Sequence, residues 1–91
     1  MKKFMLFDKY GNHIYSKQME DMEKDKFLND SKKALKKYAH DNGLPANAIL
    51  VNIAVYGGTG YRAEIDEWLW YSFITEKFWL TQKQALEDEE K

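Results

Sequence analysis

The chain contains no cysteine, which excludes disulfide bonds and thiolate zinc sites. Small secreted domains usually depend on disulfides, so this absence favours a cytoplasmic protein. Long hydrophobic runs are also missing, since no segment approaches the roughly 18–20 apolar residues of a membrane span. The apolar run at residues 4–7 is shorter than the roughly 7–15 residues that a signal peptide requires. We therefore expect a cytoplasmic protein that does not contact a membrane.

Arginine and proline are scarce, and the charges nearly cancel. The only arginine is Arg62, the only proline is Pro45, and the net charge is −1. Residues 1–47 carry ten lysines and seven acidic residues, whereas residues 48–91 carry four basic and eight acidic residues. A dedicated nucleic-acid-binding domain usually has a larger basic excess. The frequent Lys, Asn, Ile, Tyr and Phe are typical of AT-rich coding, which favours a low-GC bacterium or its phage as the source.

What is present is a globular composition with clear hydrophobic periodicity. A hydrophobic content of 44% in 91 residues predicts one domain over residues 1–91. Two extended segments within residues 2–19 predict a β-hairpin. They flank residues 8–12, where Asp8 suits the first position of a turn and Gly11 can adopt a positive φ.

The period becomes helical over residues 21–42, where an apolar stripe predicts one long helix. This stripe consists of Phe27, Leu28, Ser31, Ala34, Leu35, Tyr38 and Ala39. Acidic residues gather near the start of the segment and basic residues near its end, as the helix dipole favours. Gly43, Leu44 and Pro45 then form a stop signal in which Gly43 can provide a left-handed cap.

The second half of the chain predicts strands. Residues 49–56 are apolar on both faces of an extended chain, which is typical of a central strand. Residues 57–60 predict a tight turn, and residues 61–66 alternate as a half-buried strand does. Residues 67–80 are ambiguous, because their apolar side chains surround both a helix and a strand. The Trp, Tyr, Phe and Ile content favours a strand that continues to about Ile74, and a buried helix from near Asp66 is the alternative.

The end of the chain predicts a short helix. Thr81 and Gln84 fit a capping box in front of Ala85 and Leu86. Acidic residues 87–90 lie at the wrong end for the helix dipole, so we expect residues 87–91 to be a frayed tail. The predicted fold is α+β, with an antiparallel sheet of about four strands and the long helix packed on one face. Its order is β-β-α-β-β, followed by the short C-terminal helix.

No residue pattern predicts a catalytic, metal or cofactor site. The glycines of residues 57–60 match neither phosphate-binding template, and they lead into a strand rather than a helix. His13 and His40 fall in different elements, and neither has a second ligand at zinc-binding spacing. Glu64 and Asp66 share a strand face with Arg62, which is typical of a solvated edge. We therefore expect a protein that is not an enzyme and that holds no metal and no cofactor.

The long helix carries a basic face that supports an alternative function. Its residues are Lys26, Lys32, Lys33, Lys36 and Lys37. Such a face could follow a phosphate backbone, so nucleic-acid binding is the alternative hypothesis. It is the weaker one, because the helix offers no arginine for bidentate base recognition and Asp25, Asn29 and Asp30 dilute the charge.

Aromatic residues concentrate between residues 68 and 79. Tryptophan is rarely fully buried, and a domain with one long helix has a limited interior. We therefore expect at least one of Trp68, Trp70 and Trp79 to be exposed to solvent. Tryptophan and tyrosine are also the residues that anchor protein interfaces. We expect Trp68, Trp70, Tyr71 and Trp79 to contribute to a surface for a partner protein or for a second copy of the chain.

These observations lead to one main functional hypothesis. The chain is expected to be a small, non-enzymatic, protein-binding regulator or inhibitor. Its small size and AT-rich coding favour a phage or a mobile element, with a host defence or regulatory protein as the target. The acidic second half would steer the protein towards a basic partner surface.

Overall fold

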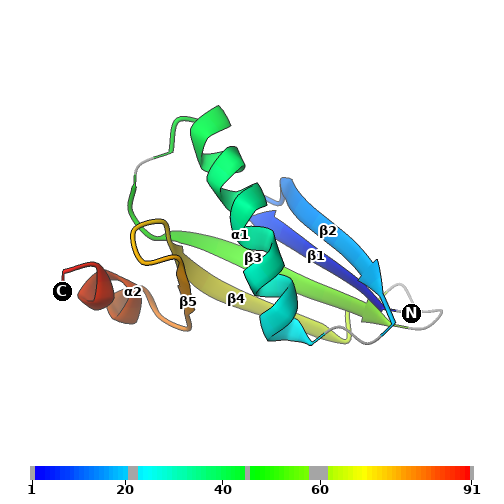
Figure 1. Ribbon diagram of the computed structural model, residues 1–91. Coiled ribbons are helices and arrows are strands. Elements are labelled where there is room, and N and C mark those ends of the chain that lie inside the picture. The colour runs from blue at the N-terminus through cyan, green and yellow to red at the C-terminus, as the bar shows by residue number, and fades with distance from the viewer. Residues whose placement is uncertain (1, 21–22, 45, 58–61, 91) are drawn as a thin grey trace.

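A computed structural model describes residues 2–20, 23–44, 46–57 and 62–90 of the chain. The elements follow the order β1 (Lys2–Asp8), β2 (His13–Met19), α1 (Lys24–Asp41), β3 (Ile49–Gly57), β4 (Ile65–Ser72), β5 (Lys77–Trp79) and α2 (Gln82–Glu89). The strands form one antiparallel sheet in the order β2-β1-β3-β4-β5, and α1 lies across one face of it (Figure 1). The predicted α+β fold with a long helix on one face is confirmed, but the sheet has five strands rather than four.

Helix α1 packs on the sheet through the predicted apolar stripe. Phe27, Leu28, Ser31 and Leu35 are buried beneath it. The ring of Phe27 lies between those of Phe4 on β1 and Tyr15 on β2, with centroid distances of 5.3 and 5.5 Å. The sheet side of this core consists of Phe4, Leu6, Val51, Ile53, Val55, Leu69 and Tyr71. This contact fixes which face of the sheet is covered.

The structure tests the predicted end of α1 but not its predicted start. Its first helical residue is Lys24, and the predicted start at residue 21 lies outside the described residues. At the other end, the amide of Gly43 donates to the carbonyl of His40 and that of Leu44 donates to Ala39. Gly43 has a φ of +60°. This is the hydrogen-bond pattern of a Schellman cap, so the predicted stop at Gly43 is confirmed.

Asp8 organises the turn between β1 and β2 and ties it to α1. Its carboxylate accepts hydrogen bonds from the amides of Tyr10 and Asn12, each 2.8 Å long, and from the side chain of Asn12. The hydroxyl of Tyr38 on α1 donates to the same carboxylate. Gly11 has a φ of +84°, as the turn prediction required. The first hairpin and the helix are therefore joined by a polar contact as well as by the core.

The ambiguous block is two strands joined by a turn. β4 begins at Ile65 and ends at Ser72, so the prediction of a strand was wrong at residues 62–64 and 73–74, and residue 61 lies outside the described residues. Residues 73–76 form the turn, which closes with a 2.9 Å hydrogen bond from the amide of Glu76 to the carbonyl of Ser72. In the predicted turn at residues 57–60, Gly57 is the last residue of β3, and residues 58–60 lie outside the described residues.

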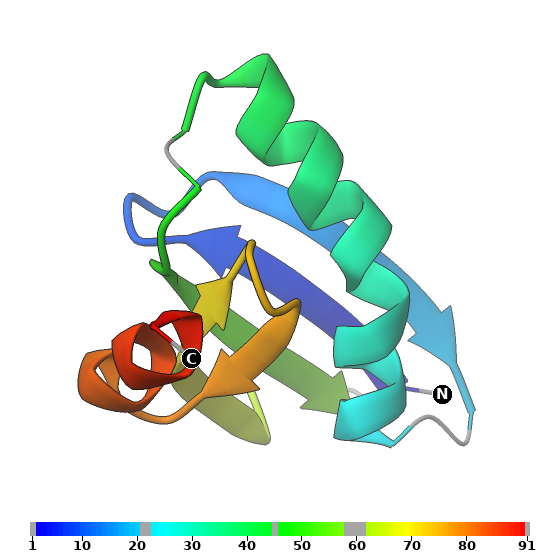
Figure 2. The same ribbon diagram turned by 60° about the vertical axis from the view of Figure 1, so that its left-hand side comes forward.

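Helix α2 begins with the predicted capping box and packs at the β4–β5 end of the sheet (Figure 2). The Gln84 amide donates to the Thr81 hydroxyl over 3.2 Å, and the Gln84 side chain accepts from the Thr81 amide over 3.3 Å. The prediction that residues 87–89 fray was wrong, because the helix continues to Glu89. Ser72 donates a 2.6 Å hydrogen bond to the Glu89 carboxylate, which holds this end against β4. None of the helices that the structure describes is long and apolar enough to span a membrane.

Candidate functional site

The two faces of the sheet differ in how they are covered. Side chains alternate between the faces along each strand, and the strand register therefore assigns every residue to one of them. Leu69 and Tyr71 of β4 point into the core beneath α1, so Trp68 and Trp70 lie on the opposite face. We call that opposite face the open face. In Figures 1 and 2, α1 lies on the other side of the sheet and α2 lies only at one end.

One row of the open face crosses four strands and ends at Trp68. Trp68 on β4 pairs with Asn52 on β3, Asn52 pairs with Phe7 on β1, and Phe7 pairs with His13 on β2. The rings of Phe7 and His13 meet edge to face at a centroid distance of 6.0 Å. Trp68 is 49% exposed and Phe7 is half-buried. The prediction that at least one of the three tryptophans is exposed is therefore confirmed.

Neighbouring rows add further apolar side chains to the open face. Met5 on β1 and Tyr56 on β3 are half-buried, whereas Ala54, which pairs with Met5, is buried. Leu50 pairs with Trp70, and Trp70 pairs with Trp79 on β5. The open face thus carries several partly exposed apolar side chains around the polar pair of Asn52 and Asp66.

Helix α2 turns the Trp70 end of the open face into a groove. Leu86 and Gln82 of α2 approach Leu50 and Trp70 there, and the groove has a volume of about 790 Å³. Its other wall comes from the first turn, the end of α1 and the start of β3, namely Asp8, Lys9, Tyr10, Tyr38, Leu44, Asn47, Ala48 and Ile49. We call it the end groove. Because Asp8 is only 4% exposed and both its oxygens accept hydrogen bonds, the groove presents mainly apolar atoms.

The charges on the open face have both signs, since the register places Lys3 of β1 and Lys77 of β5 there together with Asp66 of β4. Asp66 lies on this face and accepts a hydrogen bond from the side chain of Asn52. Glu64 pairs with Lys2 at 3.4 Å, and Glu67 pairs with Lys24 at 2.6 Å on the α1 side of β4. Beyond the Trp70 end, α2 contributes the acidic residues 87–89. The acidic Asp66 close to the exposed Trp68 favours a partner that places an apolar group against the ring and a basic group beside it.

The predicted partner-binding residues are divided between the two faces. Trp68, Trp70 and Trp79 share the open face by register. Tyr71 points the other way and is 1% exposed, so it belongs to the core and is not available to a partner. Its ring packs at 4.7 Å from Phe78 and 5.0 Å from Phe73. Burial, with a smaller contribution from the charge of Glu76, raises the pKa of Tyr71 to about 12.

The sequence prediction did not name the part of the open face that comes from the first half of the chain. Met5 and Phe7 lie beside Tyr56, Leu50 and the tryptophans because β1 is inserted next to β3 in the sheet. The sequence did contain a signal for this surface, since β1 and β3 carry apolar side chains on both of their faces. Only the strand order brings them together with Trp68, and strand order is a property of the whole fold.

The predicted lysine face is divided as well. Lys26, Lys33 and Lys37 are exposed at positions that recur along one side of α1. Lys32 instead borders a hollow of about 290 Å³ beside Phe78 and Trp79. Within the described part of the chain, none of these lysines forms an ion pair. The exposed basic surface therefore consists of a stripe of Lys26, Lys33 and Lys37 with the exposed Lys36 beside it, whereas Lys32 is half-buried.

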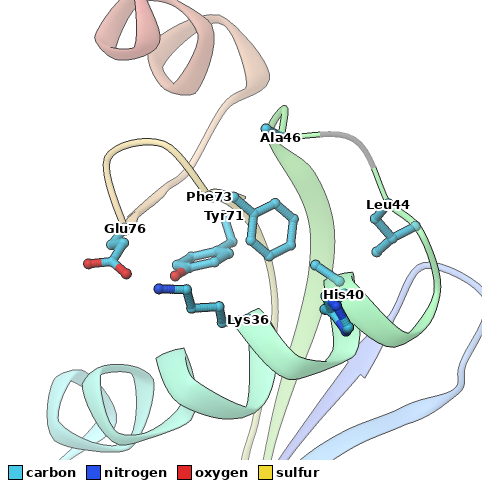
Figure 3. Close-up of a pocket in the computed structure, with 8 residues that line it drawn as sticks. Lys36, His40, Leu44, Ala46, Tyr71, Phe73 and Glu76 are labelled. Carbon is cyan, nitrogen blue, oxygen red and sulfur yellow. The ribbon is translucent and has the colours of Figure 1, made fainter.

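A second hollow separates the end of α1 from the β4–β5 turn (Figure 3). Lys36 extends from α1 towards the ring of Tyr71, and Glu76 lies across from it. The volume is about 220 Å³, which is below the roughly 300–1,000 Å³ of most ligand pockets. Among the described residues there is no group of three or more His, Cys, Asp or Glu that could hold a metal ion. The open face is therefore the stronger candidate for a functional surface.

Comparison with models of protein families, with curated proteins and with solved structures found no match to this chain. The functional interpretation consequently depends on the geometry of the open face.

Proposed function

We propose that the protein is a non-enzymatic binding protein whose open face docks a partner protein. The observation that carries this proposal is the half-exposed Trp68, which lies with Phe7, Leu50 and Trp70 on the sheet face opposite α1. Tryptophan is enriched among the residues that dominate binding energy at interfaces. Covering the exposed half of such a ring contributes roughly 2–3 kcal/mol, at about 25 cal/mol per Å².

The acidic Asp66 near Trp68 indicates which partner fits best on the β4 side of the open face. Asp66 on β4 and the acidic end of α2 lie next to apolar surface. A basic partner surface would be attracted and its association accelerated. We therefore favour a different protein over a second copy as the occupant.

The biological setting follows from the size and coding bias of the chain. The proposal is a small regulator or inhibitor that a phage or mobile element of an AT-rich genome produces in the cytoplasm. Its target would be a host defence or regulatory protein. A single apolar face of this kind can block a surface that the target needs for another contact.

Affinity capture with matched variants tests the proposal. The tagged protein is used to capture host proteins, which are then identified and purified for binding measurements. Trp68→Ala should weaken binding to the captured protein about 30-fold or more. Ile74→Ala is the control, because Ile74 is an exposed apolar residue in the β4–β5 turn and not on the open face.

Two results would contradict the proposal. Equal binding by Trp68→Ala and wild type would show that the open face is not the interface. Equal losses in Trp68→Ala and Ile74→Ala would show that general surface hydrophobicity drives the capture. Circular dichroism of both variants verifies that neither substitution unfolds the domain.

The stripe of Lys26, Lys33 and Lys37 supports nucleic-acid binding as a second candidate function. Its three ammonium groups are exposed and form no ion pair within the described residues. They could neutralise phosphates and release counterions. This candidate is weaker, because these lysines, even with the neighbouring Lys36, provide a small basic surface and the net charge of the chain is −1.

A further inference from the structure

Strand β4 has an unpaired edge over most of its length. On one side it pairs with β3 from Ile65 to Tyr71, but on the other side β5 pairs only with residues 70–72. β5 does not continue alongside the rest of β4, because the chain leaves the sheet after Trp79 and begins α2 at Gln82. Among the described strands, none pairs with the outer edge of residues 65–69. The backbone groups of these five residues, about 17 Å of strand, can therefore pair with another extended chain.

We propose that an extended segment of a basic partner protein adds to this edge as a sixth strand, in line with β5. The proposal rests on the proposed function and specifies how the partner is held. An added strand pairs its amides and carbonyls with those of β4, and its side chains continue both faces of the sheet. Those on one side would cover Trp68 and extend the open face.

The side chains at this edge define the chemistry of the added segment. Trp68 and Ile65, which are 49% and 41% exposed, favour apolar or β-branched residues opposite them. Asp66 points to the open face and is exposed, so it favours a lysine or arginine opposite it. Glu67 lies on the other face and already forms an ion pair with Lys24. The fitting segment therefore carries a basic residue and an apolar residue at successive positions of the face that meets Asp66 and Trp68, and an apolar or β-branched residue on the other face opposite Ile65.

The other edge of the sheet is better protected against such pairing. β2 is seven residues long, but its register with β1 shifts between Leu6 and Phe7. Lys17 projects from its middle and pairs with Asp30 at 3.4 Å. Irregularities and lysines are two of the devices by which edge strands avoid pairing with other chains. None of the large exposed apolar side chains lies on β2, whereas the free part of β4 has two.

A peptide of defined sequence tests the inference even before the partner is identified. The probe is a synthetic peptide of about nine residues in which valine and lysine alternate along one face and β-branched threonine fills the other, and it is long enough to span the free edge. It is titrated into the full-length isotope-labelled protein, and amide chemical shifts and hydrogen exchange are recorded. We expect shifts centred on residues 65–69 and at least about tenfold slower exchange there, because new backbone hydrogen bonds protect these amides.

Two control peptides distinguish strand addition from other modes of binding. A peptide in which glutamate replaces lysine should bind about tenfold more weakly, because it opposes Asp66. A valine–lysine peptide with alternate backbone nitrogens methylated should lose binding, since it cannot form a ladder. Absence of binding at about 1 mM, shifts confined to β2, or equal binding of the methylated peptide would overturn the inference.

A pair of charge variants tests the specificity. Asp66→Asn should reduce the preference for the lysine peptide over the glutamate peptide to about threefold or less. Asp41→Asn removes the same charge from the exposed end of α1 and should leave that preference unchanged. Equal effects of the two variants would attribute the preference to net charge and contradict a specific edge contact.

The outcomes separate this inference from the proposed function. If Trp68→Ala abolishes partner binding but no peptide protects the β4 amides, the open face binds and the strand addition is wrong. If the peptide adds to β4 but Trp68→Ala leaves partner binding unchanged, the edge binds extended chains and the open face is not the interface.

Discussion

The hydroxyl of Tyr38, in the last turns of α1, donates a hydrogen bond to the carboxylate of Asp8 at the end of β1. Asp8 is almost completely buried and accepts further hydrogen bonds from Tyr10 and Asn12. The contact therefore joins the helix to the first hairpin through one shared acceptor. It also forms part of the wall of the end groove.

Tyr38→Phe should destabilise the protein by about 1.5–3 kcal/mol, because a hydrogen bond to a charged, buried acceptor is lost. Urea unfolding followed by circular dichroism measures the change. Tyr10→Phe is the control, since Tyr10 is exposed and should change the free energy of unfolding by less than about 0.5 kcal/mol. Equal stability of Tyr38→Phe and wild type would show that the contact contributes nothing.

The same carboxylate predicts how stability falls in acid. Burial raises the pKa of Asp8, but hydrogen bonds from Tyr38, Asn12 and Tyr10 outweigh burial and hold it below the ordinary value of 3.8. The folded state thus binds this proton less readily than the unfolded state does. The stabilisation is present above pH 3.8 and is lost as the pH falls through the lower folded value. Asp8→Asn should therefore be less stable at neutral pH and should lose less stability than wild type on acidification.

At alkaline pH, two tyrosines should titrate late. Burial raises the pKa of Tyr38 and of Tyr71 to about 12, with the Asp8 carboxylate adding to the effect at Tyr38. Stability from these two groups is present below the ordinary value of 10.0 and is lost as the pH rises towards 12. Ultraviolet absorbance of tyrosinate should show two of the six tyrosines ionising near pH 12. Asp8→Asn should lower the pKa of Tyr38 alone, and a shift in Tyr71 would contradict the assignment.

The elements that could be predicted from the sequence are those with strong local signals. The helix end at Gly43 and the capping box of Thr81 and Gln84 depend on residues close in sequence, and both are present. The turn at Asp8 and Gly11 is also local. In each case the stabilising contact lies within a few residues of the signal, so periodicity and cap residues suffice.

Prediction failed where the fold overrides local signals. The β4–β5 turn contains no glycine, proline or asparagine, and its left-handed residue is Glu76, with a φ of +55°. The separation of Tyr71 from its tryptophan neighbours required the strand register. Assembly of Phe7 with Trp68 required the order of the strands. Tertiary contacts decide these features, and a linear pattern does not contain them.

The lysine stripe yields a prediction that separates the two candidate functions. If the stripe binds nucleic acid, Lys33→Glu combined with Lys37→Glu should abolish a gel shift that is visible at low salt, and the wild-type affinity should fall steeply with salt. Partner binding through the open face should be unchanged in this variant, because both lysines lie on the opposite side of the sheet. If wild type produces no gel shift at low salt, the second candidate is excluded.

The left-handed conformation of Glu76 predicts an unusual stabilising substitution. A side chain in this region costs roughly 1–2 kcal/mol, whereas glycine adopts it freely but loses more entropy on folding. Glu76→Gly should therefore raise the free energy of unfolding by about 0.5–1 kcal/mol. Because the charge of Glu76 contributes to the raised pKa of Tyr71, the substitution should also lower that pKa towards 10.0.

Glu76→Ala separates the two effects of this substitution, since alanine removes the charge and keeps the Cβ atom. It should lower the pKa of Tyr71 as much as glycine does, but it should not increase the free energy of unfolding. Urea unfolding and tyrosinate absorbance of both variants measure the two quantities independently. If alanine stabilises the protein as much as glycine does, the gain comes from removal of the carboxylate beside the buried Tyr71, and backbone strain at this turn is not its cause.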